Sequence, residues 1–210
     1  MLEIIRMILG PVATNAYLVA EPDSKNAVVI DPAWDGERIV GEASHRNWQI
    51  GQIWLTHAHF DHIGGIAGII NGMKEPPSIA LHPADLPLYR AQGGAALFGM
   101  RIGKSPEPTI HLEHGQTLRL GEHLFEVRHS PGHTPGHVVF YCALHKVMFC
   151  GDVIFEGSIG RTDLPGGDFD TLMKSIREQV LSLPEDTRLL SGHGGETTIG
   201  NECRSNPFLT

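Results

Sequence analysis

The sequence predicts a layered fold that combines strands and helices, of the α/β or the α+β class. Short apolar segments with the character of strands occur along most of the chain. Helical patterns interrupt them at 36–48 and 63–72, and another follows Asp168. Because strand, helix and strand follow one another in this order, the sequence implies helices layered on sheets.

The N-terminal part of the chain predicts four strands and one helix. Asn15 and the polar segment 23–26 supply turns, Asp31 ends the third strand, and an amphipathic helix is expected at 36–48. The four strands are predicted at 2–8, 16–20, 27–30 and 52–56.

The middle of the chain is rich in proline and glycine. A helix at 63–72 and a strand at 78–82 precede this segment, which spans 83–107. Because Pro and Gly punctuate regular structure, we expect helical turns that form a mobile rim. Further strands are predicted at 117–120, 124–129, 138–142, 147–150 and 187–191.

The clearest helical pattern of the chain follows Gly166 and Gly167. Asp168 is the predicted N-cap, because its carboxylate can accept a hydrogen bond from a backbone N–H of the first turn. Apolar residues that we expect to face the core then recur at helical spacing, namely Phe169, Leu172, Met173, Ile176 and Val180.

The size and composition of the chain are those of an ordinary globular protein. With 210 residues, of which 41% are hydrophobic and 19% charged, we expect a single domain over 1–210 with a sizeable core. No apolar run approaches the roughly 18 residues that a membrane span needs, so no membrane partner is expected. The alternating pattern of 1–9 predicts a strand rather than a signal peptide.

Charge and cysteine content narrow the function further. A net charge of −8 argues against broad nucleic-acid binding, so no nucleic-acid partner is expected. The three cysteines, Cys142, Cys150 and Cys203, are odd in number and lack CxxC spacing. They predict buried thiols in a reducing compartment and therefore a cytoplasmic location. The sequence leaves the oligomeric state open.

Four side chains that can bind metal fall within the short segment Thr56-His57-Ala58-His59-Phe60-Asp61-His62. The segment follows a predicted buried strand, where open α/β sheets hold their ligands. Two ligands for one ion followed by two for a second is a natural interpretation of the spacing. Imidazole and carboxylate together suit Zn, Mn or Fe. The alternative, a polar loop that merely carries three histidines, is much less favoured.

Three further segments share this setting, each at the end of an apolar strand and beside glycine. They carry His133, Asp152 and His193. Glycine lets the backbone approach an ion closely. Each segment alone is more typical of a turn. Added to the first four side chains, however, they make five imidazoles and two carboxylates, which suffice for two divalent ions that share one carboxylate.

In this order the metal-capable residues resemble the pattern of the metallo-β-lactamase superfamily. Within it, the chain looks most similar to short, single-domain proteins of the glyoxalase II (hydroxyacylglutathione hydrolase) type. Supporting stretches are 15–18, 29–32, 151–155, 157–163, 197–202 and 206–209. The resemblance implies an α+β fold of four layers, an αββα sandwich, with the metals at one edge of the two sheets.

The resemblance also implies roles for single residues. His57, His59 and His133 are similar to the ligands of the first metal. Asp61, His62 and His193 are similar to those of the second, and Asp152 to the bridging ligand. Asp31 is similar to a carboxylate that orients a ligand imidazole, with a turn-capping role equally open. The resemblance implies two divalent ions, with Zn preferred and Fe or Mn as alternatives.

The resemblance implies hydrolysis of a small-molecule thioester such as S-D-lactoylglutathione, and two divalent ions could supply a metal-bridging hydroxide for it. A thiolate leaves easily because the pKa of its thiol is about 8.5, so no strong general acid is needed. Asp61 is the candidate catalytic residue, since it could hold the hydroxide as well as ligate. The chain lacks the longer C-terminal helical region that binds glutathione in two-domain glyoxalase II enzymes, which leaves the acyl and thiol groups open.

Two supporting residues keep two interpretations each. Arg161 could contact substrate or pair with Asp163 to hold a loop, and pairing is slightly favoured. His137 is expected to support the site rather than to ligate.

His82 is interpreted as structural, and Tyr89 and Phe98 as local packing. The histidines that we expect to be exposed are His45, His111, His114, His123, His129 and His145.

Three other functions remain as hypotheses. The segment 160–163 also resembles persulfide dioxygenases, which would hold one Fe(II) through His57, His133 and Asp152. A lactonase, a β-lactamase or a nuclease on the same fold is the next alternative, with the nuclease least favoured because the chain is acidic. A protein that uses the fold only for binding is least expected, given the complete ligand set.

Overall fold

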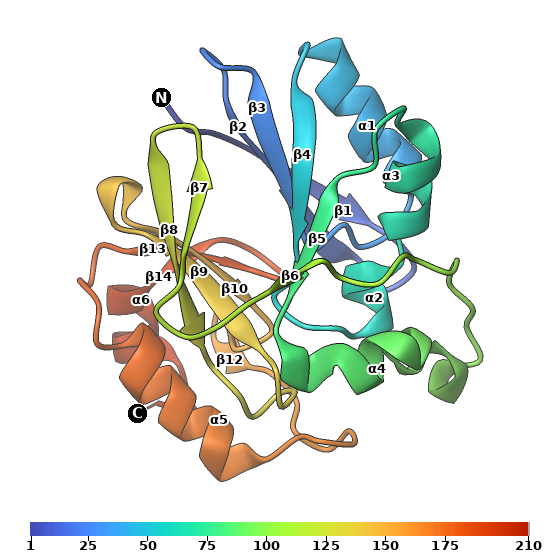
Figure 1. The fold of residues 1–210 in the computed structure, drawn as a ribbon. Helices are drawn as coiled ribbons and strands as arrows, with labels where there is room; N and C mark the ends of the chain where they lie inside the picture. The colour runs from blue at the N-terminus through green and yellow to red at the C-terminus, as the bar shows by residue number, and fades with distance from the viewer. Residues whose placement is uncertain (210) are drawn as a thin grey trace.

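Residues 1–209, which the computed structural model describes, form two six-stranded sheets that pack face to face, with helices on the outer face of each (Figure 1). A two-stranded hairpin, β11–β12, forms a small third sheet that contacts β13 of the second sheet. This arrangement is the αββα sandwich of the α+β class. No helix within these residues has both the length and the apolar character needed to span a membrane.

The first sheet has the order β1-β2-β3-β4-β5-β6. Its first three strands are antiparallel, whereas β3 to β6 are parallel, as expected where helices connect the strands. The strands are β1 Glu3–Leu9, β2 Thr14–Glu21, β3 Asn26–Ile30, β4 Gln49–Trp54, β5 Ser78–Leu81 and β6 Ile110–His111.

The second sheet has the order β14-β13-β10-β9-β8-β7. All neighbours in it are antiparallel except β10 and β13. The strands are β7 Thr117–Leu120, β8 His123–His129, β9 Val138–Cys142, β10 Val147–Gly151, β13 Arg188–Ser191 and β14 Thr197–Thr198, and the hairpin consists of β11 Ile154–Phe155 and β12 Ser158–Ile159.

Helices cover the outer faces of both sheets. α1 (Gly36–His45) and α3 (Ile66–Gly72) pack on the first sheet, and α5 (Phe169–Ser175) packs on the second. A π-helical segment, Ile176–Val180, continues α5. The remaining helices are α2 Phe60–Ile63, α4 Leu86–Arg90 and α6 Ile199–Ser205, with short 3-10 segments at Pro83–Asp85, Gln92–Phe98 and Ala143–His145.

The core explains the apolar runs of the sequence. In β3, Val29 faces the helices of the first sheet, whereas Val28 and Ile30 face the second sheet. Both faces of the strand are therefore buried, and its sequence is apolar without alternation. Between the sheets the ring of Trp54 contacts that of Phe125, with 5.1 Å between centroids.

Several sequence predictions need correction. The helix predicted at 63–72 begins at Phe60 and is interrupted at Gly64 and Gly65, where a Cβ on Gly65 would lie 2.5 Å from the Pro32 carbonyl oxygen. The strand predicted at 52–56 ends at Trp54, so the ligand segment begins in a loop. Phe169 lies outside the core, with 50% of its surface exposed. The sequence reading did not predict the helix α6.

Candidate metal centre

Every predicted ligand segment lies beyond the end of a strand, at one edge of the two sheets. His57 follows β4, His133 follows β8, Asp152 follows β10 and His193 follows β13. Because β4 belongs to the first sheet and the other three strands to the second, residues from both sheets contribute to one cluster.

The first group of donors consists of His57, His59 and His133. One ring nitrogen of each lies within 4.8 Å of one from each of the others, and all three side chains are buried. His59 Nδ1 and His133 Nε2 are 2.8 Å apart. The other ring nitrogen of His133, Nδ1, donates to the Arg161 carbonyl oxygen at 2.7 Å. This bond leaves Nε2 of a neutral imidazole as the unprotonated donor atom.

The second group consists of Asp61, His62 and His193, whose donor atoms also lie within 4.8 Å of one another. Asp61 Oδ2 is 3.2 Å from His193 Nε2 and 3.5 Å from His62 Nε2. Thr14 Oγ1 donates to the same oxygen at 2.9 Å and thereby fixes the carboxylate.

Asp152 faces both groups. Its Oδ2 is 3.6 Å from His133 Nε2 and 3.6 Å from His193 Nε2, and its Oδ1 is 3.3 Å from His62 Nε2. The structure thus brings together all seven side chains that the sequence predicted as ligands, with one carboxylate between two sets of three.

The site also contains buried nitrogen and oxygen atoms that make no hydrogen bond. Within residues 1–209, His57 Nε2, His62 Nε2 and Asp152 Oδ1 are buried and make no hydrogen bond, although the last two lie 3.3 Å from each other. Buried polar atoms are almost always hydrogen-bonded, and leaving one unpaired costs about 1–3 kcal/mol. Unpaired nitrogen and carboxylate atoms that converge fit cation binding, so the donor set fits two divalent ions.

Asp31 holds two of these histidines in position. Its Oδ2 is 3.0 Å from His62 Nδ1 and accepts a hydrogen bond from Thr56 Oγ1 at 2.6 Å, and its Oδ1 accepts from Thr56 N at 2.8 Å. His57 Nδ1 lies 3.0 Å from the same Thr56 hydroxyl. Both imidazoles therefore present Nε2 to the site. Asp31, His57 and His62 also satisfy the distance for a metal group, but the Asp31 oxygens are already engaged with Thr56.

His137 lies behind the site rather than in it. Its Nε2 accepts a hydrogen bond from Asp152 N at 3.0 Å, and its ring stacks on that of His57 with 4.7 Å between centroids. Burial lowers the pKa of His137 well below its usual value. The neutral ring can therefore accept this bond and hold Asp152, as a supporting residue would.

The electrostatics of the site divide its histidines. Burial, followed by the nearby His62, lowers the pKa of His57 well below its usual value, and burial with His133 lowers that of His59 to about 3. Burial also acts on His62, but three surrounding carboxylates outweigh it and raise its pKa well above the usual value. Burial opposes ionisation of Asp61, yet His62 and His193 hold its pKa at about 2.

Sequence reasoning missed two residues that contact the site. Thr14 bonds to Asp61 as described, and Asp85 accepts three hydrogen bonds from the loops that carry His57, His59 and His133. Asp85 stood in a Pro-rich segment predicted to be a surface rim, and no pattern marked it as buried. The prediction that His123 is exposed is wrong as well, because it lies 6% exposed beside Glu21 and His145.

A family model for the metallo-β-lactamase superfamily matches residues 9–193, a span that includes all seven predicted ligands. The chain belongs to the metallo-β-lactamase superfamily. It is 39% identical to the hydroxyacylglutathione hydrolase GloC of Haemophilus influenzae, over 89% of each chain.

Two solved structures of this metallo-β-lactamase fold are also similar to the chain. The B3 metallo-β-lactamase BLEG-1 matches with a TM-score of 0.89 and 39% identity, over 100% of both chains. The protein TTHA1623, crystallised in a di-iron-bound form, matches with a TM-score of 0.88 and 43% identity, over 98% of this chain and 100% of the other.

A pocket of about 200 Å³ lies over the donors of this superfamily member. Five of the seven predicted ligands line it, namely His59, Asp61, His133, Asp152 and His193. Apolar side chains contribute much of its wall: Val12, Phe60, Phe98, Met100 and Leu164. Arg161 also lines it, and its guanidinium donates twice to Asp163, at 2.7 Å each. The pairing interpretation of Arg161 agrees with this contact, and its role toward substrate stays a prediction. Phe98 both lines the pocket and packs on Phe60.

Proposed function

We propose that the chain is a metal-dependent hydrolase of thioesters, with S-D-lactoylglutathione as the representative substrate. The observation that carries the proposal is the pair of donor groups with Asp152 between them, in a chain of the metallo-β-lactamase superfamily. The similarity to a hydroxyacylglutathione hydrolase supports the choice of thioester.

In this proposal each donor group holds one divalent ion. His57, His59 and His133 would bind the first, Asp61, His62 and His193 the second, and Asp152 both. We prefer Zn, with Fe or Mn as alternatives, because all three accept imidazole and carboxylate; a similar protein is known with two irons. When bound, two such ions supply a nucleophilic water at neutral pH and polarise the substrate carbonyl.

The residues of the chain have distinct tasks. Asp61, anchored by Thr14, is placed to accept a hydrogen bond from the attacking water and so to orient it, in addition to ligating. Asp31 keeps His62, and Thr56, which Asp31 holds, keeps His57 in the tautomer that exposes Nε2. The departing thiolate needs no proton donor, because the pKa of a thiol is about 8.5.

The pocket wall suits the uncharged part of a thioester. Val12, Phe98, Met100 and Leu164 would exclude water around the acyl group and strengthen electrostatic interactions at the carbonyl. Arg161, at the same pocket, is the predicted contact for an anionic part of the thiol, although its pair with Asp163 reduces the charge that it offers. We also retain the predictions of a small-molecule substrate without nucleic-acid or membrane partner, and of a cytoplasmic location.

The test is an assay of the metal-loaded protein against S-D-lactoylglutathione, with elemental analysis of the same sample. The proposal predicts hydrolysis and two divalent ions per chain. One iron per chain, with oxygen consumed when glutathione persulfide is added, would replace the hydrolase by a persulfide dioxygenase. Hydrolysis of a lactone or a β-lactam but not of the thioester would keep the metal centre and change the substrate class.

A further inference from the structure

Asp85 is a fully buried carboxylate that joins the rim to both loops of the first donor group. Its Oδ2 accepts hydrogen bonds from Ala58 N at 3.0 Å and from Thr134 Oγ1 at 2.8 Å. Its Oδ1 accepts from Gly136 N at 2.6 Å. Ala58 stands between His57 and His59, and Thr134 follows His133. Two of the three groups that donate to Asp85 therefore adjoin the histidines, and the third, Gly136, lies three residues after His133 in the same loop.

We propose that Asp85 is a positioning residue that fixes His57, His59 and His133 as the donors of one ion. The inference rests on the metal centre proposed above and concerns how its first half is built. Hydrogen bonds to an ionised carboxylate are about twice as strong as neutral ones, and burial strengthens them further. Two of the three donors are backbone N–H groups, so Asp85 fixes the path of the loops.

The packing around Asp85 leaves little room for another arrangement. A Cβ on Gly136 would lie 2.6 Å from Asp85 N. Gly93, further along the rim, has a φ of +62°, and a Cβ there would lie 2.2 Å from Phe60 N. The rim therefore lies directly against the ligand segment. If the Asp85 carboxylate were removed, the three groups that donate hydrogen bonds to it would stay buried without a partner, because the close packing leaves no room for another arrangement.

The second donor group is held by other residues. Thr14 bonds to Asp61, Asp31 to His62, and Asn15 donates through Nδ2 to the Ser191 and Gly194 carbonyls on either side of His193. None of these described contacts involves Asp85. Removing Asp85 should therefore weaken the binding of one of the two ions. Removing Asp31, which contacts His62 directly and His57 through the Thr56 hydroxyl, should weaken the binding of both.

The experiment measures Zn(II) affinity by competition with a chromophoric chelator, and the absorption spectrum of the Co(II)-substituted protein, for D85N, D85A, T134V and T134S. Outer partners of metal ligands typically contribute about 10- to 100-fold in affinity. We expect D85A to weaken one metal equivalent by about this factor and to change the Co(II) spectrum of that site. D85N and T134V should weaken the same metal equivalent by smaller factors. T134S keeps the hydroxyl that donates to Asp85 and should therefore retain wild-type affinity.

The matched control is E202Q. Glu202 is 1% exposed and also accepts three hydrogen bonds, from Gly157 N, Thr197 Oγ1 and Asn206 Nδ2, none of which belongs to a neighbour of a predicted ligand. This variant should lower the melting temperature without changing either metal affinity. If D85A does not fold, D85N and T134V provide the same comparison.

Two results would overturn the inference. The first is a set of Asp85 and Thr134 variants whose two metal affinities match those of E202Q. The second is an equal loss at both ions, which would make Asp85 a general stabilising residue. A wild-type protein that binds no metal would instead remove the proposed centre itself, so the two failures are distinguishable.

Discussion

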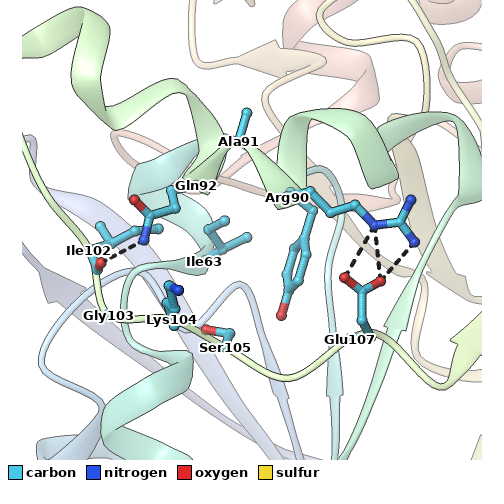
Figure 2. A pocket seen from close by; sticks show the side chains of 10 residues that line it. Ile63, Arg90, Ala91, Gln92, Ile102, Gly103, Lys104, Ser105 and Glu107 are labelled. Carbon is cyan, nitrogen blue, oxygen red and sulfur yellow. Dashed lines mark hydrogen bonds and ion pairs between the residues drawn. The ribbon is translucent and has the colours of Figure 1, made fainter.

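The two cavities next to the rim differ in volume and in whether the polar groups near them already have bonding partners. The larger, about 410 Å³, lies between α4 and the segment 102–107. Three of its polar side chains have partners in Figure 2: Arg90 pairs with Glu107, at 2.9 Å, and Gln92 donates to the backbone carbonyl oxygen of Ile102, at 3.1 Å. Arg90 and Glu107 are also well exposed, at 59% and 60%.

The pocket over the metal-ligand candidates has about half that volume, 200 Å³, yet it is lined by Asp152, whose buried Oδ1 has no hydrogen-bond partner within residues 1–209 and lies 3.3 Å from His62 Nε2, an atom in the same state. Exposed and paired charges are already satisfied by water and by each other, so they offer little to a ligand. Buried nitrogen and oxygen atoms without a partner destabilise the folded protein unless a cation binds to them. In this molecule, buried atoms without hydrogen-bond partners, rather than the size of a cavity, mark the candidate metal centre.

The strongest test of this contrast exchanges one acid in each cavity. Asp152→Asn removes the charge that faces both donor groups, and we expect kcat/KM for the thioester to fall by at least about 10³-fold, equivalent to about 4 kcal/mol. Glu107→Gln, in the larger cavity, should leave kcat/KM within about twofold. Equal effects of the two substitutions would contradict the assignment of the site.

A second test uses pH on the metal-free protein. His59 has a pKa of about 3 when folded and about 6.5 in its usual state, and the pKa of His137 is also lowered. Between these values the unfolded chain binds more protons, so stability falls as pH drops below about 6.5. His62 acts in the opposite sense, because its raised pKa adds stability that is lost as pH rises above that range.

We therefore expect the melting temperature in the presence of a chelator to be highest near pH 6.5 and to drop steeply toward pH 5. The exposed pair Arg90–Glu107 should contribute little to this slope. H137N should flatten it, since this histidine must stay neutral to accept from Asp152 N. A melting temperature that is constant between pH 5 and 7 would contradict the buried, neutral state of these rings.

A third test concerns the apolar wall of the smaller pocket. Phe98→Ala should raise KM for the thioester several-fold, about 1 kcal/mol, with little change in kcat, because the ring would bind ground state and transition state alike. Leu97→Ala is the matched control, since Leu97 is 70% exposed and does not line that pocket. Steady-state kinetics of both variants decide the point. An unchanged KM in the Phe98 variant would exclude this wall from substrate binding.

The smallest effect is expected at the larger cavity itself. Arg90→Ala breaks an exposed ion pair and should change the free energy of unfolding by less than about 1 kcal/mol. Chemical denaturation measures this directly, and activity should stay within about twofold of wild type. A large loss of activity in this variant would mean that the cavity of Figure 2 takes part in the reaction.

Much of this architecture could be predicted from the sequence, because buried strands read as short apolar runs and ligands as clustered His and Asp. His57, His59, Asp61 and His62 were visible as such a cluster, whereas His133, Asp152 and His193 were predicted from their position beside glycine at the ends of apolar strands and from the order of all seven along the chain. Asp85 and Thr14 were not, since their significance comes from contacts with residues 27 to 51 positions away along the chain. The break between α2 and α3 likewise depends on the approach of Pro32 to Gly65, a tertiary contact that no local pattern encodes.

The number of metal ions that the seven predicted ligands bind is the most direct test of the candidate centre. Titration of the chelated wild-type protein with Zn(II), followed by calorimetry and elemental analysis, should show two ions per chain, and D152N should weaken both. Binding of no ion, or of two ions whose affinities are unaffected by D152N, would contradict the placement of the centre between the two groups of three donors.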